Sequence, residues 1–569
     1  MRISHLVAIP LAAALALDVL TAPAQERPID AVRSGSRAHL HENDVRPRLD
    51  REALDAYIER ARLDWQVPGI AVAAIQDGAV VYQRGFGVRE IDKVPRVDER
   101  SLFEIGSLTK AFTATAVALL VDEGRISWDD LVIDHLPTFR LADPWLTEHV
   151  TIRDLLAHRA GVESNVSAVV PMSAAQVLGN ARTARAWVSF RDEALYSNMM
   201  YNIAGELIAA VSGMSWAEFV QRRLLDPLGL HDSSPSADLA GVWDAAHLAP
   251  SMYGQAPAGR AGIEDATGHN VTMPHWHTPK GPKALPWQIS LRGGAPTGSM
   301  VSNLHDLSLW LRFNLNEGRD QAGRPLLSAA TLQELRTPQI MIRDPTQFSF
   351  SRVWEAVNRI SPTTERVSYA MGWFHHTYRG HRYLYHGGAL LGGMSLIAMI
   401  PDRGTGVIVL ANSYGRDGSG LLNDVIALRI FDALLGAQSH DWSRDLLAVA
   451  EQEEHEAEVA EAGLQRQRRR GVPPSLPLQR YVGEYENPAF GRAAIVLAGD
   501  RLVFRKPGVV DWRLEHWHGD IFRMHVSTSG VDLMRFFLRF HIDPQGQPAS
   551  FDPGWDLLGG PFMRVSSAR

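Results

Sequence analysis

The sequence predicts an α+β domain followed by a small antiparallel β-barrel, and three observations support this fold class. Segments of β type stand before and after a mainly helical middle, which indicates one sheet built from both ends of a domain. A Gly- and Pro-rich break at 471–477 then ends a charged segment. Beyond it, short strands alternate with turn signals, as in a small barrel. We expect the α+β domain at 45–438, a charged helix and linker at 439–477, and the barrel at 478–569.

Length and composition are those of a folded chain with more than one domain. Of 569 residues, 45% are hydrophobic and 21% are charged, which is ordinary globular usage. A net charge of -7 leaves no global basic footprint, so we expect no nucleic-acid partner. Cysteine is absent, which excludes disulfides and thiol nucleophiles. Any nucleophile must therefore be an oxygen or an amine.

The N-terminus has the pattern of a secretory signal peptide at 1–24. Arg2 and His5 precede a mostly apolar run at 6–20, and Ala22-Pro23-Ala24 has the small-x-small pattern of a cleavage site. A buried N-terminal helix is the alternative interpretation. No later stretch has about 18 uninterrupted apolar residues, so we expect no integral membrane span. We expect cleavage after Ala24 and a periplasmic or secreted protein.

The elements of the α+β domain follow from local patterns. Asp77-Gly78 between two β-prone runs predicts a hairpin at 67–89. The segment 111–121 has no charged residue, which predicts a fully buried helix that ends near Gly124. Further helices are expected at Ile152–His158, Ile203–Val211, Trp216–Leu225 and Leu304–Asn314, and strands at 384–386, 394–400 and 406–411.

The C-terminal part opens with a charged helix. Residues 451–461 hold six Glu and no Lys or Arg, and four of the residues 466–470 are Arg. This order matches a solvated helix aligned with its own dipole, with a polyanion-binding arm as the alternative. Barrel strands are expected at 481–485, 493–497, 502–505, 512–517, 521–526 and 536–542.

One tetrad, Ser107-Leu108-Thr109-Lys110, points to nucleophilic catalysis. It stands at the start of the predicted buried helix, where positions i and i+3 share a face. A Ser hydroxyl is a poor nucleophile near neutral pH, and a neighbouring amine with a depressed pKa can take its proton. Ser107 and Lys110 are therefore candidate catalytic residues.

The wider run Phe103–Lys110 resembles the active-site signature of the serine penicillin-recognising superfamily, which includes class C β-lactamases, D,D-peptidases, D-aminopeptidases and related esterases. Two more motifs follow in the family's order, Tyr196-Ser197-Asn198 and His386-Gly387-Gly388. The likeness covers about Val67 to Ser413, and the tail resembles a lipocalin-like barrel found in some relatives. Tyr485-Glu486-Asn487 repeats the second motif in the predicted barrel, where we expect a structural role.

The resemblance implies a β-lactamase/transpeptidase-like fold and an acyl-enzyme mechanism without metal or cofactor. Ser107 would attack a carbonyl while Lys110 and Tyr196 move protons. Asn198 would contact the bound acyl amide, and the backbone N–H groups of Ser107 and Ala389 would form the oxyanion hole. Gly387 and Gly388 would line the substrate on the same strand.

The resemblance also makes His386 a candidate catalytic residue. It stands where many relatives have Lys, and this changes the expected substrate. Histidine is charged only below a pKa near 6.5 unless its surroundings shift it, so we expect acylation to be pH-sensitive around that pKa. A weaker demand for a substrate carboxylate favours a peptidase on short peptides, including those with D-residues. A carboxylesterase, a β-lactamase and a non-catalytic binding or sensor protein are the alternatives.

Other histidines do not form a recognisable metal site. His269, His275 and His277 could be metal ligands, but they stand in a Pro-rich stretch with no carboxylate at helical spacing. We expect a loop near the substrate cleft there. His375-His376 is expected to be structural.

Overall fold

The computed structural model describes residues 49–163, 174–236, 270–285, 295–345, 348, 350–416, 418, 420–506, 511–528, 530–554 and 560–565. The signal peptide expected at 1–24 and His269 lie outside the described residues.

The centre of the first domain is an antiparallel sheet of eight strands in the order β2-β1-β12-β11-β10-β9-β8-β7. Strand β1 pairs with β12, so that Ile70 lies opposite Ala411, and the sheet is built from both ends of the domain as predicted. The strands are β1 Gly69–Gln76, β2 Ala79–Gly87, β7 Ile340–Met341, β8 Ser368–Tyr369, β9 Phe374–Tyr378, β10 His381–Leu390, β11 Gly393–Ile400 and β12 Thr405–Ala411.

Strand β1 shows why the sheet is covered on both faces. Its alternate residues Ala71 and Ala73 belong to one apolar core, while Ile70 and Val72 belong to the other. Successive side chains of a strand point to opposite faces, so a strand apolar at every position needs a helical layer on each side. The predicted hairpin follows, because Asp77 and Gly78 supply the two positive φ angles, 53° and 75°, of a tight turn.

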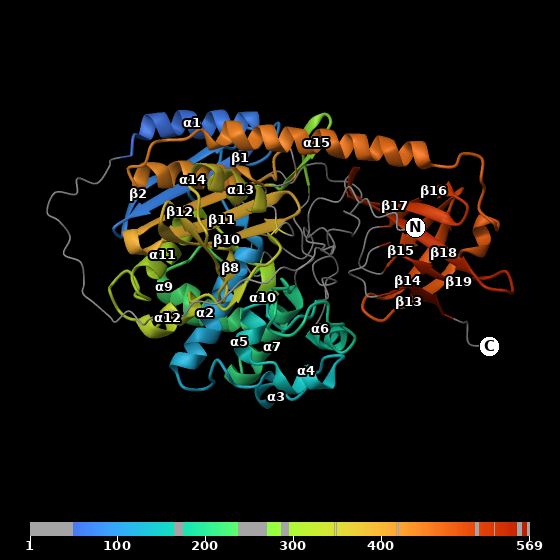
Figure 1. Ribbon diagram of the computed structural model, residues 1–569, viewed down its shortest axis with the longest axis horizontal. Coiled ribbons are helices and arrows are strands. Elements are labelled where there is room, and N and C mark those ends of the chain that lie inside the picture. Colours follow the sequence, from blue (N-terminus) through green and yellow to red (C-terminus); the bar gives the residue numbers. More distant parts are fainter. Residues whose placement is uncertain are drawn as a thin grey trace, which may run out of the picture.

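Helices form these two layers (Figure 1). One layer contains α1 Arg51–Asp64, α13 Phe350–Ile360 and α14 Leu422–Leu434. On the other face α11 Leu304–Leu315 packs against β1 and β12, and α2 Thr109–Asp122 stacks its Phe112 ring on Trp310 at 3.9 Å. Every residue of α2 from Thr109 to Leu120 is buried, which confirms the predicted buried helix.

The remaining elements of this domain are short, apart from α7 Asn198–Ser212. The predicted helix at 216–225 is α8 Trp216–Val220 followed by a π-helical turn, Gln221–Leu225. The others are the 3-10 turn η1 Gly106–Leu108, α3 Val132–His135, α4 Pro144–His149, α5 Ile152–Leu156, α6 Ala174–Ala181, α9 Asp226–Leu228, α10 Ala295–Gly298 and α12 Ala329–Leu335, with the strand pairs β3 Phe103–Glu104 with β6 Val301–Ser302 and β4 His275–Thr278 with β5 Gly281–Ala284.

The C-terminal part is a closed antiparallel barrel of eight strands, as the spacing of its strands predicts. Aromatic rings fill its interior, among them the stacked pair Phe504 and Trp512. In the repeated Tyr-x-Asn motif, Tyr485 is buried and donates to the Tyr481 carbonyl at 2.9 Å, which is a structural role. The strands are β13 Gly483–Asn487, β14 Gly491–Ala498, β15 Arg501–Arg505, β16 Trp512–His518, β17 Ile521–Thr528, β18 Val531–Ile542, β19 Pro548–Asp552 and β20 Phe562–Arg564.

A long helix, α15 Trp442–Gln467, runs from the sheet domain to the barrel (Figure 1). Its Glu residues are solvated only in part, since some, such as Glu458, are exposed and others form ion pairs. Arg416 pairs with Glu451 at 3.0 Å and with Glu454 at 3.3 Å, and Arg523 of the barrel holds Glu461 through two bonds of 2.6 Å. The acidic side chains therefore attach the helix to both parts of the chain.

Within the described ranges, no single helix is long and apolar enough to cross a membrane. One pair, Asn198–Ser212 with Trp216–Leu228, reaches the required length together, but it is bent by 75°.

Candidate active site

Ser107 and Lys110 lie on one turn of the chain, as their spacing predicts. Ser107 is half-buried in η1, and Lys110 is fully buried in the first turn of α2. Lys110 Nζ lies 3.0 Å from Ser107 Oγ. The amine is therefore in hydrogen-bond contact with the hydroxyl, the geometry that proton transfer between them requires.

The surroundings of Lys110 prepare it to act as a base. Burial lowers the pKa of Lys110 to about 7, against a smaller opposing effect of the Glu163 charge. Nζ also donates to Asn198 Oδ1 at 2.8 Å and to the Thr297 carbonyl at 2.9 Å. A neutral amine has two hydrogens for these two acceptors, which leaves its lone pair for the Ser107 hydroxyl.

Tyr196 completes the contacts of Ser107. It directly precedes Ser197, which caps α7 by accepting the Met200 N–H at 3.3 Å. Lys110 Nζ lies 4.8 Å from the centre of the Tyr196 ring. Burial raises the pKa of Tyr196, although a hydrogen bond with Ser107 lowers it in part. The phenol is therefore protonated at neutral pH and can donate a proton.

The third motif lies on β10, which passes unusually close to η1. A Cβ atom on Gly388 would stand 1.8 Å from the Ile105 carbonyl oxygen, and one on Gly106 would stand 2.7 Å from the Ala389 backbone nitrogen. Ser395 Oγ closes the same contact by donating to the Ile105 carbonyl at 2.7 Å. Glycine at 106 and 388 thus brings the Ala389 amide next to the Ser107 turn. Gly387 lies beside them on the same strand.

The structure corrects the expected behaviour of His386. Its Nδ1 donates to the Gly387 carbonyl at 2.6 Å, so its Nε2 must accept from the Tyr369 hydroxyl at 3.0 Å. Burial, together with the charge of Lys110, lowers the pKa of His386 to about 3. The expectation that His386 gains charge near pH 6.5 is therefore wrong, because a buried ring beside a cation stays neutral.

The histidines at 275–277 stand in a hairpin and not in a loop. His275 on β4 accepts the Ile91 N–H at 2.9 Å through Nε2 and lies 3.0 Å from the Asn412 carbonyl through Nδ1. Its backbone N–H donates to the Gly392 carbonyl, which places the hairpin beside the β10–β11 turn. The described residues contain no group of three or more potential metal ligands.

Several residues at the site were not singled out from the sequence. The carbonyl of Thr297 binds Lys110, the Tyr369 hydroxyl binds Nε2 of His386, and the centre of the His158 ring lies 4.3 Å from that of the Tyr196 ring. A backbone carbonyl leaves no side-chain signal in a sequence. His158 does stand in the family-like segment 151–161, and that segment was the available clue.

Comparison with known proteins identifies the family of each part of the chain. The family model described as Beta-lactamase matches residues 54–429, and a domain of unknown function, DUF3471, matches residues 467–557. The chain is 26% identical over 549 residues to the unguisins hydrolase ungD of Aspergillus violaceofuscus, which covers 90% of this chain and 89% of that protein. It is 25% identical to protein flp of Staphylococcus aureus strain COL over 63% of each chain.

Two solved structures share the fold. The octameric penicillin-binding protein homologue from Pyrococcus abyssi superposes with a TM-score of 0.55 at 21% identity, covering 91% of this chain and all of that one. SurE superposes with a TM-score of 0.50 at 20% identity, covering 90% and 99%. Because the family model spans well over half of the chain, the protein belongs to the Beta-lactamase family and is a serine hydrolase of that family.

Proposed function

We propose that the protein is a peptidase that cleaves short peptides through an acyl-enzyme on Ser107. The supporting observation is that Ser107 contacts both a base and an acid. Lys110, with a pKa near 7, accepts the hydroxyl proton as Ser107 attacks the carbonyl carbon. Tyr196, still a phenol, donates a proton to the departing amine. Amide cleavage needs this second step, because an unprotonated amine is a poor leaving group.

The remaining site residues are assigned by position. The backbone N–H groups of Ser107 and Ala389 receive the developing oxyanion, and the contact between β10 and η1 holds them together. Asn198 binds Lys110 and faces the acyl amide. Neutral His386 supplies no cation for a substrate carboxylate, which supports substrates that do not depend on one. A relative named for hydrolysis of unguisins supports hydrolytic activity of this architecture.

The test compares two leaving groups in the wild-type protein and in Tyr196→Phe. The substrates are D- and L-alanyl p-nitroanilide and p-nitrophenyl acetate. We expect Tyr196→Phe to lower anilide hydrolysis by about 10²-fold or more, the size of a lost general acid, and ester hydrolysis much less, because nitrophenolate leaves without a proton. A wild-type protein that hydrolyses only the ester would be a carboxylesterase, which would overturn the peptidase proposal.

We also propose that the protein is exported after removal of residues 1–24. The support is the basic, apolar and small-residue order of Arg2, 6–20 and Ala22-Pro23-Ala24. The mass of the protein recovered from outside the cytoplasm should correspond to a chain that begins at Gln25. A chain that keeps residues 1–24 in the cytoplasm would contradict the proposal.

A further inference from the structure

His158 is attached to the chain on both sides of Tyr196. It follows α5 in a left-handed turn, with φ of 57°, and only 1% of it is exposed. Its carbonyl accepts the Leu195 N–H at 2.9 Å, and its ring Nδ1 accepts the Ser197 N–H at 3.0 Å. The residue before Tyr196 and the residue after it are thus both bound to one histidine.

The ring of His158 also contacts the Tyr196 side chain. The two ring centres are 4.3 Å apart, and the centres of the Tyr369 and Tyr201 rings lie 4.6 Å and 5.1 Å from that of His158. Because Nδ1 accepts a backbone N–H, the ring must keep that nitrogen unprotonated. Burial, with smaller contributions from Lys110 and His386, holds the pKa of His158 well below its usual range.

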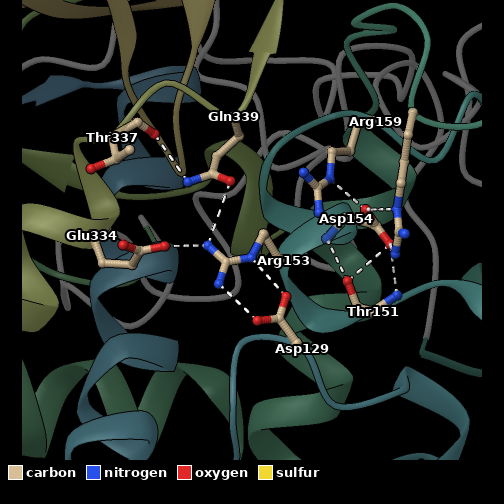
Figure 2. A network of polar contacts seen from close by, with 9 residues as sticks. Asp129, Thr151, Arg153, Asp154, Arg159, Glu334, Thr337 and Gln339 are labelled. Atoms are coloured by element: carbon tan, nitrogen blue, oxygen red, sulfur yellow. Dashed lines mark hydrogen bonds and ion pairs between the residues drawn. The ribbon is translucent and has the colours of Figure 1, made fainter. Parts of the chain in front are cut away.

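The turn that carries His158 is itself fixed by a buried carboxylate. Asp154 is fully buried, caps α5 together with Thr151 and forms an ion pair with Arg159, as Figure 2 shows. It also binds Arg191 at 2.8 Å, and the Arg191 N–H donates to the Arg159 carbonyl. Burial alone would raise the pKa of Asp154, but the bonds from Arg191 and Thr151 lower it, so the carboxylate stays charged. The segment from Arg191 to Tyr196 is therefore bonded to the turn that carries His158, beginning at Arg191.

We propose that His158 is a positioning residue that holds the Tyr196 hydroxyl at Ser107. The inference rests on the proposed function, since it assigns His158 to the proton donor of that site. The bond to Leu195 comes from the backbone, but the bond to Ser197 needs an acceptor on the side chain, which a residue that only filled the core would not supply. Nε2 of His158 has no hydrogen-bond partner among the described residues, and leaving a buried polar atom unpaired costs stability. The chain bears this cost at a position where Nδ1 of the same ring accepts the Ser197 N–H.

Two variants of similar size distinguish the role of the Nδ1 hydrogen-bond acceptor of His158 from that of the volume of its side chain. His158→Asn keeps an acceptor at the δ position and tolerates a positive φ, whereas His158→Gln moves the acceptor one bond outward. The readout is the rate of alanyl p-nitroanilide hydrolysis, whose departing amine needs the Tyr196 proton, with p-nitrophenyl acetate as the substrate that does not need it. We expect His158→Gln to lower this rate by about tenfold or more, because sub-ångström misplacement of a catalytic group is costly. We expect His158→Asn to remain close to the wild-type rate.

The same His158 substitution in the Tyr196→Phe protein shows whether the loss of rate depends on the Tyr196 hydroxyl. In Tyr196→Phe, which lacks the hydroxyl to be positioned, His158→Gln should cause no further loss. His376→Gln is the matched control, because His376 is also buried and packs on Trp354 at 4.3 Å, away from Ser107. If His158→Gln does not fold, His158→Gly removes the ring, keeps the carbonyl bond to Leu195 and suits the positive φ.

The outcomes are distinct. A wild-type rate in His158→Gln, or a loss that persists in full in Tyr196→Phe, would overturn the positioning role. Absence of anilide hydrolysis in the wild-type protein would instead overturn the proposed function on which this role depends.

Discussion

Replacing Gly388 by alanine should disrupt the oxyanion hole while leaving the rest of the site in place. The added Cβ would stand 1.8 Å from the Ile105 carbonyl oxygen and 2.5 Å from Ser395 Oγ, whereas ordinary contact begins at 3.4 Å. Strand β10 and the Ser107 turn would have to move apart by the difference, about 1.6 Å, because the obstructing atom at Ile105 is backbone. The Ala389 amide would move with β10.

The expected loss follows from that displacement. Misplacing a catalytic group by about 1 Å costs about 10²-fold, and removal of one oxyanion donor costs about 10²- to 10³-fold in kcat. We therefore expect Gly388→Ala to lower kcat for p-nitrophenyl acetate by at least about 10²-fold. An ester substrate is chosen because its leaving group does not depend on Tyr196.

Gly393→Ala is the matched control on the neighbouring strand. Its Cβ would meet only the Ala411 carbonyl oxygen at 3.8 Å, which is ordinary contact. This variant should keep the wild-type kcat, and Tm values for both variants show whether they fold. A folded Gly388→Ala protein with wild-type kcat would refute the assignment of the Ala389 amide to the oxyanion hole.

Three further predictions concern charge. The rate at which a fluorophosphonate labels Ser107 should rise as pH increases through about 7 and then level off, because only neutral Lys110 can accept the proton. No separate inflection from His386 should appear near pH 6.5, since the pKa of His386 is about 3. Labelling rates measured from pH 5 to 9 test both expectations. His386→Lys should lower stability by about 3 kcal/mol or more, because it places a cation in a buried site beside Lys110, and an unchanged unfolding midpoint in urea would contradict this. Glu461→Gln should cost about 2 kcal/mol at pH 7, because it leaves Arg523 without its charged partner. The pKa of Glu461 is lowered to about 2, so its contribution to folding stability is present above pH 4.5 and declines as pH falls toward 2. The stability lost in Glu461→Gln should therefore shrink over the same pH range. Glu458→Gln, at an exposed position, should show neither effect.

Much of the fold follows from local patterns that tertiary contacts do not override. The turn at Asp77-Gly78 and the uncharged helix at 111–121 are predicted from a few residues and are present in the structure. The shortest strands escape such prediction. Strands β7 and β8 have two residues each, and β20 has three, which is too short for an alternating pattern to appear.

The spacing of motifs predicts which residues could meet, and the structure brings Ser107, Lys110, Tyr196 and Asn198 together. Protonation states could not be predicted in the same way. His386 is neutral because of its burial and its neighbour Lys110, which lies far from it in the sequence. The bonds of His158 to Leu195 and Ser197 depend likewise on a turn that only the folded chain creates.

The most direct test of the account is intact-mass spectrometry of the wild-type protein and of Ser107→Ala after incubation with a fluorophosphonate at pH 8. We expect one stoichiometric adduct in the wild-type protein, mapped to the peptide that contains Ser107, and none in Ser107→Ala. An adduct of equal yield in Ser107→Ala, or one mapped to another residue, would contradict the claim that Ser107 is the nucleophile.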